Sequence, residues 1–260
     1  MRITRIGGPT VLIEWMGWRI LTDPTFDAPG RTYSFGLGTS SRKTAGPAIQ
    51  LDEVGDVDIV LLSHHQHADN LDDAGRAGLS RASTVVTTVA GAKALGHPHA
   101  RGLESGAKTL MIDSGRPTIT VVATPCRHGP PLTRPIVGPA TGFALTLEGA
   151  DRPGLWVTGD TVLYGGLRRA AAGLEPDVAI VNIGAVKFPL TGPLAYTMDA
   201  AAAVELIELA APGIVVPAHV EGWSHFTEQE EAAAAVFAGA PAAVRERIRW
   251  LPLGDPVDVM

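Results

Sequence analysis

The chain has 260 residues, of which 45% are hydrophobic, and this is enough to bury a sizeable core. Its formal net charge of −6 and the lack of a long basic run argue against a nucleic-acid-binding surface. The single cysteine, Cys126, excludes an intrachain disulfide. The N-terminus lacks a secretory core and no apolar segment is long enough to cross a bilayer, so we expect a cytoplasmic protein without stable membrane insertion.

The first elements are a β-hairpin and a long loop. Two β-rich runs, residues 10–15 and 18–22, flank Met16-Gly17, and this pattern predicts a tight turn with Gly17 at positive φ. Residues 28–50 are rich in Gly, Ser, Thr and Pro, which predicts a long loop. Long loops in compact domains are often functional, so this segment is a candidate cover for a pocket.

The remaining chain alternates between short strands and a few helices. Further strands are predicted over residues 57–62, 84–89, 109–112, 118–124, 141–147, 155–158, 178–182, 214–217 and 248–251. Helices are predicted over residues 71–79 and 197–211, and a capping box at residues 227–230 predicts the start of the last long helix. No internal repeat or linker divides the sequence, so we expect a single domain over residues 1–260.

Metal-ligating residue types follow several of these predicted strands. The strand over residues 57–62 leads directly into Ser63-His64-His65-Gln66-His67-Ala68-Asp69-Asn70. Later strands end shortly before His128, Asp160 and His219. Imidazole nitrogens and carboxylate oxygens suit zinc, iron or manganese, whereas the absence of a thiolate cluster argues against a structural zinc site. We therefore expect a catalytic metal cleft built from His65, His67, Asp69, His128, Asp160 and His219.

The order of these residues resembles the signature of the metallo-β-lactamase-fold hydrolases, His-x-His-x-Asp-His followed by a lone His, an Asp and a last His. The corresponding residues are His65, His67, Asp69, Asn70, His128, Asp160 and His219. The opening segments 7–13 and 20–24 are similar to the branch that contains ascorbate-6-phosphate lactonase and the N-acylphosphatidylethanolamine phospholipases. The resemblance covers nearly the whole chain. It implies an α+β four-layer αββα sandwich, in which two mixed β-sheets pack face to face with helices outside.

Two features depart from that signature. Asn70 stands where the family places a histidine that helps to hold a second metal, and a neutral amide oxygen is a weaker zinc ligand, so the resemblance implies a weakened second site. His64 also precedes the motif, and a shift of one residue would make His64 and His67 the first ligands and leave His65 outside. The spacing from His65 to Asp69 fits the signature without an insertion, so we prefer the His65 register and keep His64 as the alternative.

These residues favour a metal-dependent hydrolase that acts on an ester, lactone or phosphodiester bond of a small molecule. A bound divalent ion, one or two per chain, would activate water; zinc is favoured, with manganese or iron as alternatives. Asp160 would ligate or bridge the metals, and Asp69 would ligate the second ion or act as general base. The alternative function is a non-catalytic or regulatory metal-binding protein with a degenerate second site, which Asn70 supports.

Three further residues are candidates for substrate contact. His225 follows His219 closely enough to lie near the mouth of the cleft, and Lys187 and Arg127 would suit an anionic group on a substrate. The sequence is compatible with a homo-oligomer and indicates no nucleic-acid partner.

Overall fold

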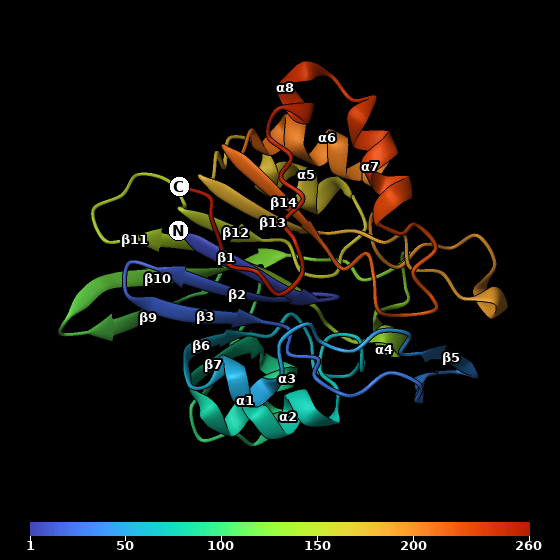
Figure 1. Cartoon of the computed structure of the whole chain (residues 1–260), viewed down its shortest axis with the longest axis horizontal. Coiled ribbons are helices and arrows are strands. Elements are labelled where there is room, and N and C mark those ends of the chain that lie inside the picture. Colours follow the sequence, from blue (N-terminus) through green and yellow to red (C-terminus); the bar gives the residue numbers. More distant parts are fainter.

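Two β-sheets form the centre of the computed structural model, which describes all 260 residues (Figure 1). The first sheet has seven strands and the second has six, and each mixes parallel with antiparallel pairs. The first sheet has the order β15 (Val257–Asp258), β1 (Arg2–Gly7), β2 (Thr10–Trp15), β3 (Trp18–Thr22), β6 (Val57–Leu61), β7 (Ala82–Thr88) and β8 (Ala100–Leu103). The second has the order β14 (Ile214–Ala218), β13 (Val178–Asn182), β12 (Leu155–Val157), β11 (Thr141–Leu147), β10 (Arg116–Pro125) and β9 (Lys108–Asp113).

Helices cover the outer face of each sheet (Figure 1). The first sheet is covered by α1 (Leu51–Val54), α2 (Asp73–Gly78), the 3₁₀ turn η1 (Leu79–Arg81) and α3 (Val89–Leu95). The second sheet is covered by α5 (Gly165–Ala171), α6 (Ala200–Ala210), α7 (Glu230–Ala238) and α8 (Ala242–Arg245). The predicted four-layer αββα sandwich is therefore confirmed.

Three buried clusters hold these layers together. The largest has 23 buried residues and lies between the two sheets, where side chains such as Ile59 and Phe143 are fully buried. A second cluster joins α5–α8 to the second sheet, and a third joins α1 and α2 to the first. Burial of this apolar surface, at roughly 25 cal/mol per Å², is the main force that holds the sheets face to face.

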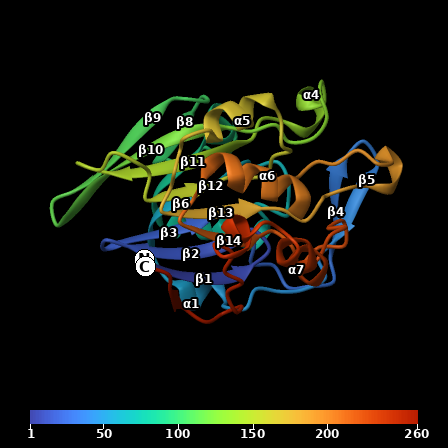
Figure 2. The same ribbon diagram turned by 90° about the horizontal axis from the view of Figure 1, so that it is seen from above.

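The loops at one end of the sandwich carry additional short elements. The hairpin β4 (Thr32–Gly36) and β5 (Thr39–Arg42) lies there with α4 (Arg134–Val137) and the 3₁₀ turn η2 (Pro189–Thr191). Seen from above, the hairpin and α4 project at the same end of the molecule (Figure 2). The segment predicted as a long loop thus contains a two-stranded sheet.

Two local predictions differ from the structure. Helix α7 begins at Glu230 with Gln229 as its N-cap, and Thr227, predicted to open the capping box, instead donates its hydroxyl to the Ala185 carbonyl. The predicted final strand over residues 248–251 forms only one bridge, from Ile248 to Val215, and the edge strand of the first sheet is β15. By contrast, the hairpin turn is as predicted, with positive φ at both Met16 and Gly17. No helix is both long and apolar enough to cross a membrane.

Candidate metal centre

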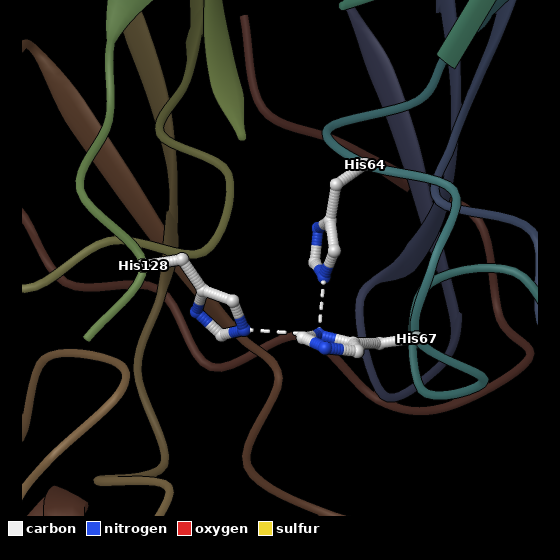
Figure 3. Close-up of side chains that lie close together, drawn as sticks. All are labelled: His64, His67 and His128. Carbon is white, nitrogen blue, oxygen red and sulfur yellow. Dashed lines mark hydrogen bonds between the residues drawn. The ribbon is translucent and has the colours of Figure 1, made fainter. Parts of the chain in front are cut away.

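Three imidazoles from two loops converge (Figure 3). They lie at the end of the sandwich that also carries the β4–β5 hairpin, α4 and η2. His64 and His67 follow β6, and His128 follows β10. One ring nitrogen from each lies within 4.8 Å of the others, and all three side chains are buried. His64 Nε2 and His128 Nε2 face His67 Nδ1 at 3.0 Å and 3.1 Å. We call this group the histidine cluster.

The outer ring nitrogens of the histidine cluster are anchored by neighbouring groups. His128 Nδ1 donates to the Tyr196 carbonyl at 2.9 Å, which leaves Nε2 unprotonated in the neutral ring. His64 Nδ1 lies 2.9 Å from Ser63 Oγ. Burial, followed by the neighbouring histidines, lowers the pKa of His64 well below its usual value and that of His67 to about 3. His64 and His67 are therefore neutral at physiological pH and carry lone pairs that a cation can use.

A second group of ligand-type residues adjoins the first. Asp69, Asp160 and His219 are fully buried, and one ligand atom from each lies within 4.8 Å of the others. We call this group the carboxylate cluster. Burial alone would raise the pKa of Asp69, but His219 and His225 hold it well below its usual value. Burial alone would lower the pKa of His219, yet Asp160 and Asp69 raise it to about 9.

His219 shows that the carboxylate cluster fits a cation. Its Nδ1 donates to the Ile183 carbonyl at 3.0 Å, so Nε2 of the neutral ring carries a lone pair. That nitrogen is buried without a hydrogen-bond partner and faces Asp160 Oδ2 at 3.3 Å and Asp69 Oδ2 at 3.4 Å. A lone pair aimed at two carboxylates is unfavourable unless a proton or a metal ion lies between them. The donor set of both clusters therefore suits a divalent transition metal.

Asn70 lies beside the two carboxylates of this second cluster. One terminal atom of its amide lies 3.0 Å from Asp160 Oδ2 and 3.2 Å from Asp69 Oδ1, and the other lies 3.2 Å from Ser63 Oγ. Because ionised carboxylates can only accept hydrogen bonds, we assign the amide nitrogen to their side in the metal-free protein. An amide in this orientation presents a donor, and a metal needs an acceptor. Asn70 thus bridges the carboxylates, and its amide would have to turn over to serve as a ligand.

The loop after β6 places His64, and not His65, in the histidine cluster. The Ser63 amide donates to Asp23 Oδ1 at 2.7 Å, which fixes the residue before His64. The chain then bends at His65 and Gln66, and the Gln66 side chain donates to the carbonyls of Val137 and Pro139. The structure thus brings together the residues of the alternative register, His64 and His67, whereas the His65 ring belongs to neither cluster and its Nδ1 has no hydrogen-bond partner.

One cavity opens onto both clusters. Its volume is about 320 Å³, and its lining includes His67, His128, Asp69 and His225. The remaining walls are mainly apolar and come from β4, the hairpin tip, α4, η2 and nearby loops: Phe35, Leu37, Ile136, Val137, Val186, Phe188, Leu190 and Tyr196. No lysine or arginine lines this cavity, which we call the apolar cavity.

The three predicted substrate residues occupy different places. His225 lines the apolar cavity, where its Nε2 lies 3.0 Å from Asp69 Oδ2 and its ring stacks on Phe188. Lys187 is outside that lining, and its amide donates to the His225 carbonyl at 3.2 Å. Arg127 lines a different, neighbouring cavity.

The sequence analysis assigned no role to Asp23, which the structure places beside the carboxylate cluster. Asp23 is buried at the exit of β3, and burial followed by the nearby Asp160 raises its pKa well above the usual value. Asn182, at the end of β13, donates to Asp160 Oδ1 at 2.9 Å. Both follow the same pattern as the predicted ligands, a polar residue at a strand exit, and that signal was present in the sequence.

Comparison with known proteins gives one family for most of this chain. The model described as "Beta-lactamase superfamily domain" matches residues 18–220. A protein of Cupriavidus necator named "UPF0173 metal-dependent hydrolase" is 29% identical in an alignment of 229 positions, and the match covers 79% of this chain and 73% of the relative. A protein of the same name from Carboxydothermus hydrogenoformans is 28% identical, and the match covers 86% of each chain.

Solved structures resemble the whole fold. An isothiocyanate hydrolase from Delia radicum gut bacteria superimposes with a TM-score of 0.80 at 18% identity, covering 99% of both chains. A possible metal-dependent hydrolase from Veillonella parvula gives a TM-score of 0.81 at 18% identity, covering 99% of this chain and 98% of the other. At these identities the likeness concerns the fold.

Proposed function

This chain belongs to the family of beta-lactamase superfamily domains, and we propose that it is a metal-dependent hydrolase that cleaves an ester or lactone bond of a small molecule with an apolar group. The observation that carries this proposal is the apolar cavity, because it opens onto both ligand clusters and has no cationic wall. Ester and lactone substrates are neutral at the scissile bond, whereas a phosphodiester brings a negative charge that apolar walls would leave unpaired.

The ligand clusters define where metal would be held. His64, His67 and His128 would hold one ion, and Asp160, Asp69 and His219 would hold or share a second. Zinc is favoured by this nitrogen and oxygen donor set, with manganese or iron as alternatives. A divalent ion in such a site lowers the pKa of a coordinated water towards about 7 and polarises a carbonyl oxygen.

The protein's own residues orient and activate the reactants. Asp69 borders the apolar cavity, and His225 Nε2 holds its carboxylate at 3.0 Å, so we assign Asp69 as the acceptor of the proton from the attacking water. The Tyr196 carbonyl fixes the His128 ring through Nδ1. Phe35 and Phe188 pack on the His225 ring and exclude bulk water from this side of the carboxylate.

The shape of the entrance supports an apolar substrate. Leu37 is 70% exposed, Leu190 is 68% exposed and Ile136 is 56% exposed, and all three line the apolar cavity. Large apolar side chains are costly to leave exposed without a function, and here they come from three separate loops around one opening. An acyl or aryl group that enters the cavity would cover part of this surface.

The test is a substrate series on protein reconstituted with zinc. We expect kcat/KM for p-nitrophenyl acetate, butyrate and octanoate to rise by up to about fourfold per methylene until the cavity is filled. Bis(p-nitrophenyl) phosphate should react more slowly than any of the esters. Phenethyl isothiocyanate belongs in the panel because its body is apolar and a structurally similar protein is named an isothiocyanate hydrolase.

Two controls separate the parts of this proposal. Val137→Trp should fill the cavity and reduce the preference for octanoate over acetate while the metal content is unchanged. Full ester hydrolysis by chelated protein would contradict the metal-dependent mechanism. Faster cleavage of the phosphodiester than of the esters would contradict the ester or lactone assignment alone.

The second candidate is a non-catalytic or regulatory metal-binding protein, and Asn70 is the observation that favours it. Its amide bridges the two carboxylates as a donor, which opposes binding of a second ion. Elemental analysis together with the substrate panel distinguishes the two functions. One tightly held ion with no turnover on any substrate would favour the binding protein, whereas turnover with either one or two ions favours the hydrolase.

A further inference from the structure

A second cavity lies behind the loop that carries His128. Its volume is about 580 Å³, and it shares only His128 and Thr133 with the lining of the apolar cavity. Its walls come from α3, the loop after β8, the loop from Pro125 to Thr141, and Tyr164. We call it the cationic cavity, because Lys93, Arg127 and Arg134 line it against a single carboxylate, Glu104.

The charges of this cavity are uncompensated within the protein. Lys93, Arg127 and Arg134 have no salt bridge and no side-chain hydrogen bond, although most arginines of this chain, such as Arg116 and Arg168, pair with a carboxylate or a carbonyl. The chain as a whole has a net charge of −6, so a cavity with this local excess of positive charge is unusual in it. Unpaired cations around a concave surface raise the local concentration of anions.

The Arg127 side chain lacks a hydrogen-bond acceptor in the protein. Its Nε is buried and has no hydrogen-bond partner. A buried guanidinium nitrogen without an acceptor is costly, and such groups in native structures call for a ligand or an ion. The backbone of Arg127 is fixed on both sides, since its amide donates to Thr161 Oγ1 and its carbonyl accepts from the Val162 amide.

Aromatic stacking also orients the Arg127 side chain. The guanidinium carbon lies 4.7 Å from the centre of the Tyr164 ring, and this cation–π contact holds the planar group over the ring. Guanidinium is the side chain best suited to bind a carboxylate or phosphate through two parallel hydrogen bonds. Hydroxyl groups of Thr88 and Ser105 on the same lining supply further donors.

The volume and the apolar walls of the cationic cavity indicate a ligand larger than an inorganic ion. Val89, Leu103 and Leu132 contribute apolar surface, and a volume of about 580 Å³ lies in the range of sites for small organic ligands. We propose that the cationic cavity binds a small organic anion, with a carboxylate or phosphate group on Arg127 and its body against the apolar wall. This site adjoins the metal centre through His128, but Arg127 belongs to neither ligand cluster, and the proposal does not depend on the proposed hydrolase function.

The test uses chelated, metal-free protein, because anions also bind to metal ions. Isothermal titration with phenyl phosphate and with benzoate should show saturable binding of at least one of them. Benzyl alcohol, which has the same ring without the charge, should bind at least about tenfold more weakly. Inorganic phosphate should bind more weakly than phenyl phosphate, because it lacks the apolar body. The stronger of the two ring anions identifies the acidic group that the cavity prefers.

Matched substitutions locate the binding site. Arg127→Gln should lower the affinity for the anion by about tenfold or more. Arg42→Gln removes another unpaired arginine, which lies outside the cavity, and should leave the affinity unchanged. Lys93→Gln on the exposed face of α3 should weaken binding severalfold and gives a second variant if Arg127→Gln fails to fold. Equal binding by Lys93→Gln, Arg127→Gln and the wild type, or binding that requires metal, would overturn the proposal.

Discussion

The histidine cluster and the carboxylate cluster lie side by side but differ in how their buried side chains are charged. In the histidine cluster, burial keeps His64 and His67 neutral, and their nitrogens face one another with no carboxylate inside the cluster. In the carboxylate cluster, two acidic side chains are buried with His219, whose pKa is raised to about 9. The first cluster contains imidazoles alone, and the second already contains its own counter-charge.

This difference should govern how each cluster binds metal. A cation entering the histidine cluster displaces only weak contacts between neutral rings. A cation entering the carboxylate cluster must replace the proton on His219 and turn the Asn70 amide away from the two carboxylates. We therefore expect the histidine cluster to hold the tighter ion, and the carboxylate cluster to bind the weaker one.

The largest expected effect comes from the pair His64 and His65. His64→Ala removes a nitrogen of the histidine cluster and should lower kcat/KM by more than about a hundredfold, since even outer contacts of metal ligands are worth about 10- to 100-fold. His65→Ala, one residue further along, removes a ring that touches neither cluster and should change kcat/KM by less than about threefold. Steady-state kinetics on one ester, with metal content measured for both variants, decides the register. A larger loss in His65→Ala would restore the register that the motif spacing suggested.

A smaller effect is expected at the carboxylate cluster. Asn70→His replaces the bridging amide by an imidazole that can offer a lone pair to a metal. The affinity for the second ion should rise by about tenfold or more, which elemental analysis after dialysis against a weak chelator would detect as additional metal per chain. Asn70→Ala is the control, because it also removes the amide bridge but supplies no ligand. Equal metal content in Asn70→His and Asn70→Ala would show that the amide, and not the missing imidazole, sets occupancy.

The sequence was sufficient to predict the fold, and it also predicts where a metal centre would lie. Apolar runs bounded by turns predicted most strands, and the order of His, Asp and His residues at strand exits matched a known family, so the sandwich was confirmed. Strand exits are informative because neighbouring strands bring their ends to one edge of the sheets. The same rule predicts that His128, Asp160 and His219 lie near one another.

The exact ligand register was not accessible to the same reasoning. It depends on the path of the loop at His65 and Gln66, where the Gln66 side chain donates to the carbonyls of Val137 and Pro139, about seventy residues away in the chain. Pattern spacing assumes an even loop and cannot reveal such a long-range contact. The linings of the two cavities could not be predicted for the same reason. Loops that are far apart in sequence supply the apolar wall of one cavity and the cations of the other.

The smallest expected effect is on the stability of the chelated protein as pH changes. The folded-state pKa of His67, about 3, lies below the usual histidine value of about 6.5, so only the unfolded chain takes up this proton as pH falls. Stability is therefore constant above about pH 6.5 with respect to this group and falls by up to about 1.4 kcal/mol per pH unit below it. His219 acts in the opposite direction, since its stabilisation is complete below about pH 6.5 and is lost as pH rises through about 9.

Thermal unfolding between about pH 6.5 and about pH 5.5 measures the loss of stability that we expect from His67. The slope of the unfolding free energy against pH gives the number of protons taken up on unfolding, and His67→Ala should reduce that number by about one. This holds whatever the effect of the substitution on the absolute melting temperature. His99→Ala, which removes an exposed histidine outside both clusters, should leave the slope as in the wild type. The slope is the quantity to compare, because a cavity left by the lost ring lowers stability equally at both pH values. An unchanged slope in His67→Ala would mean that the ring is already protonated in the folded, metal-free protein, and the histidine cluster would then carry charge as the carboxylate cluster does.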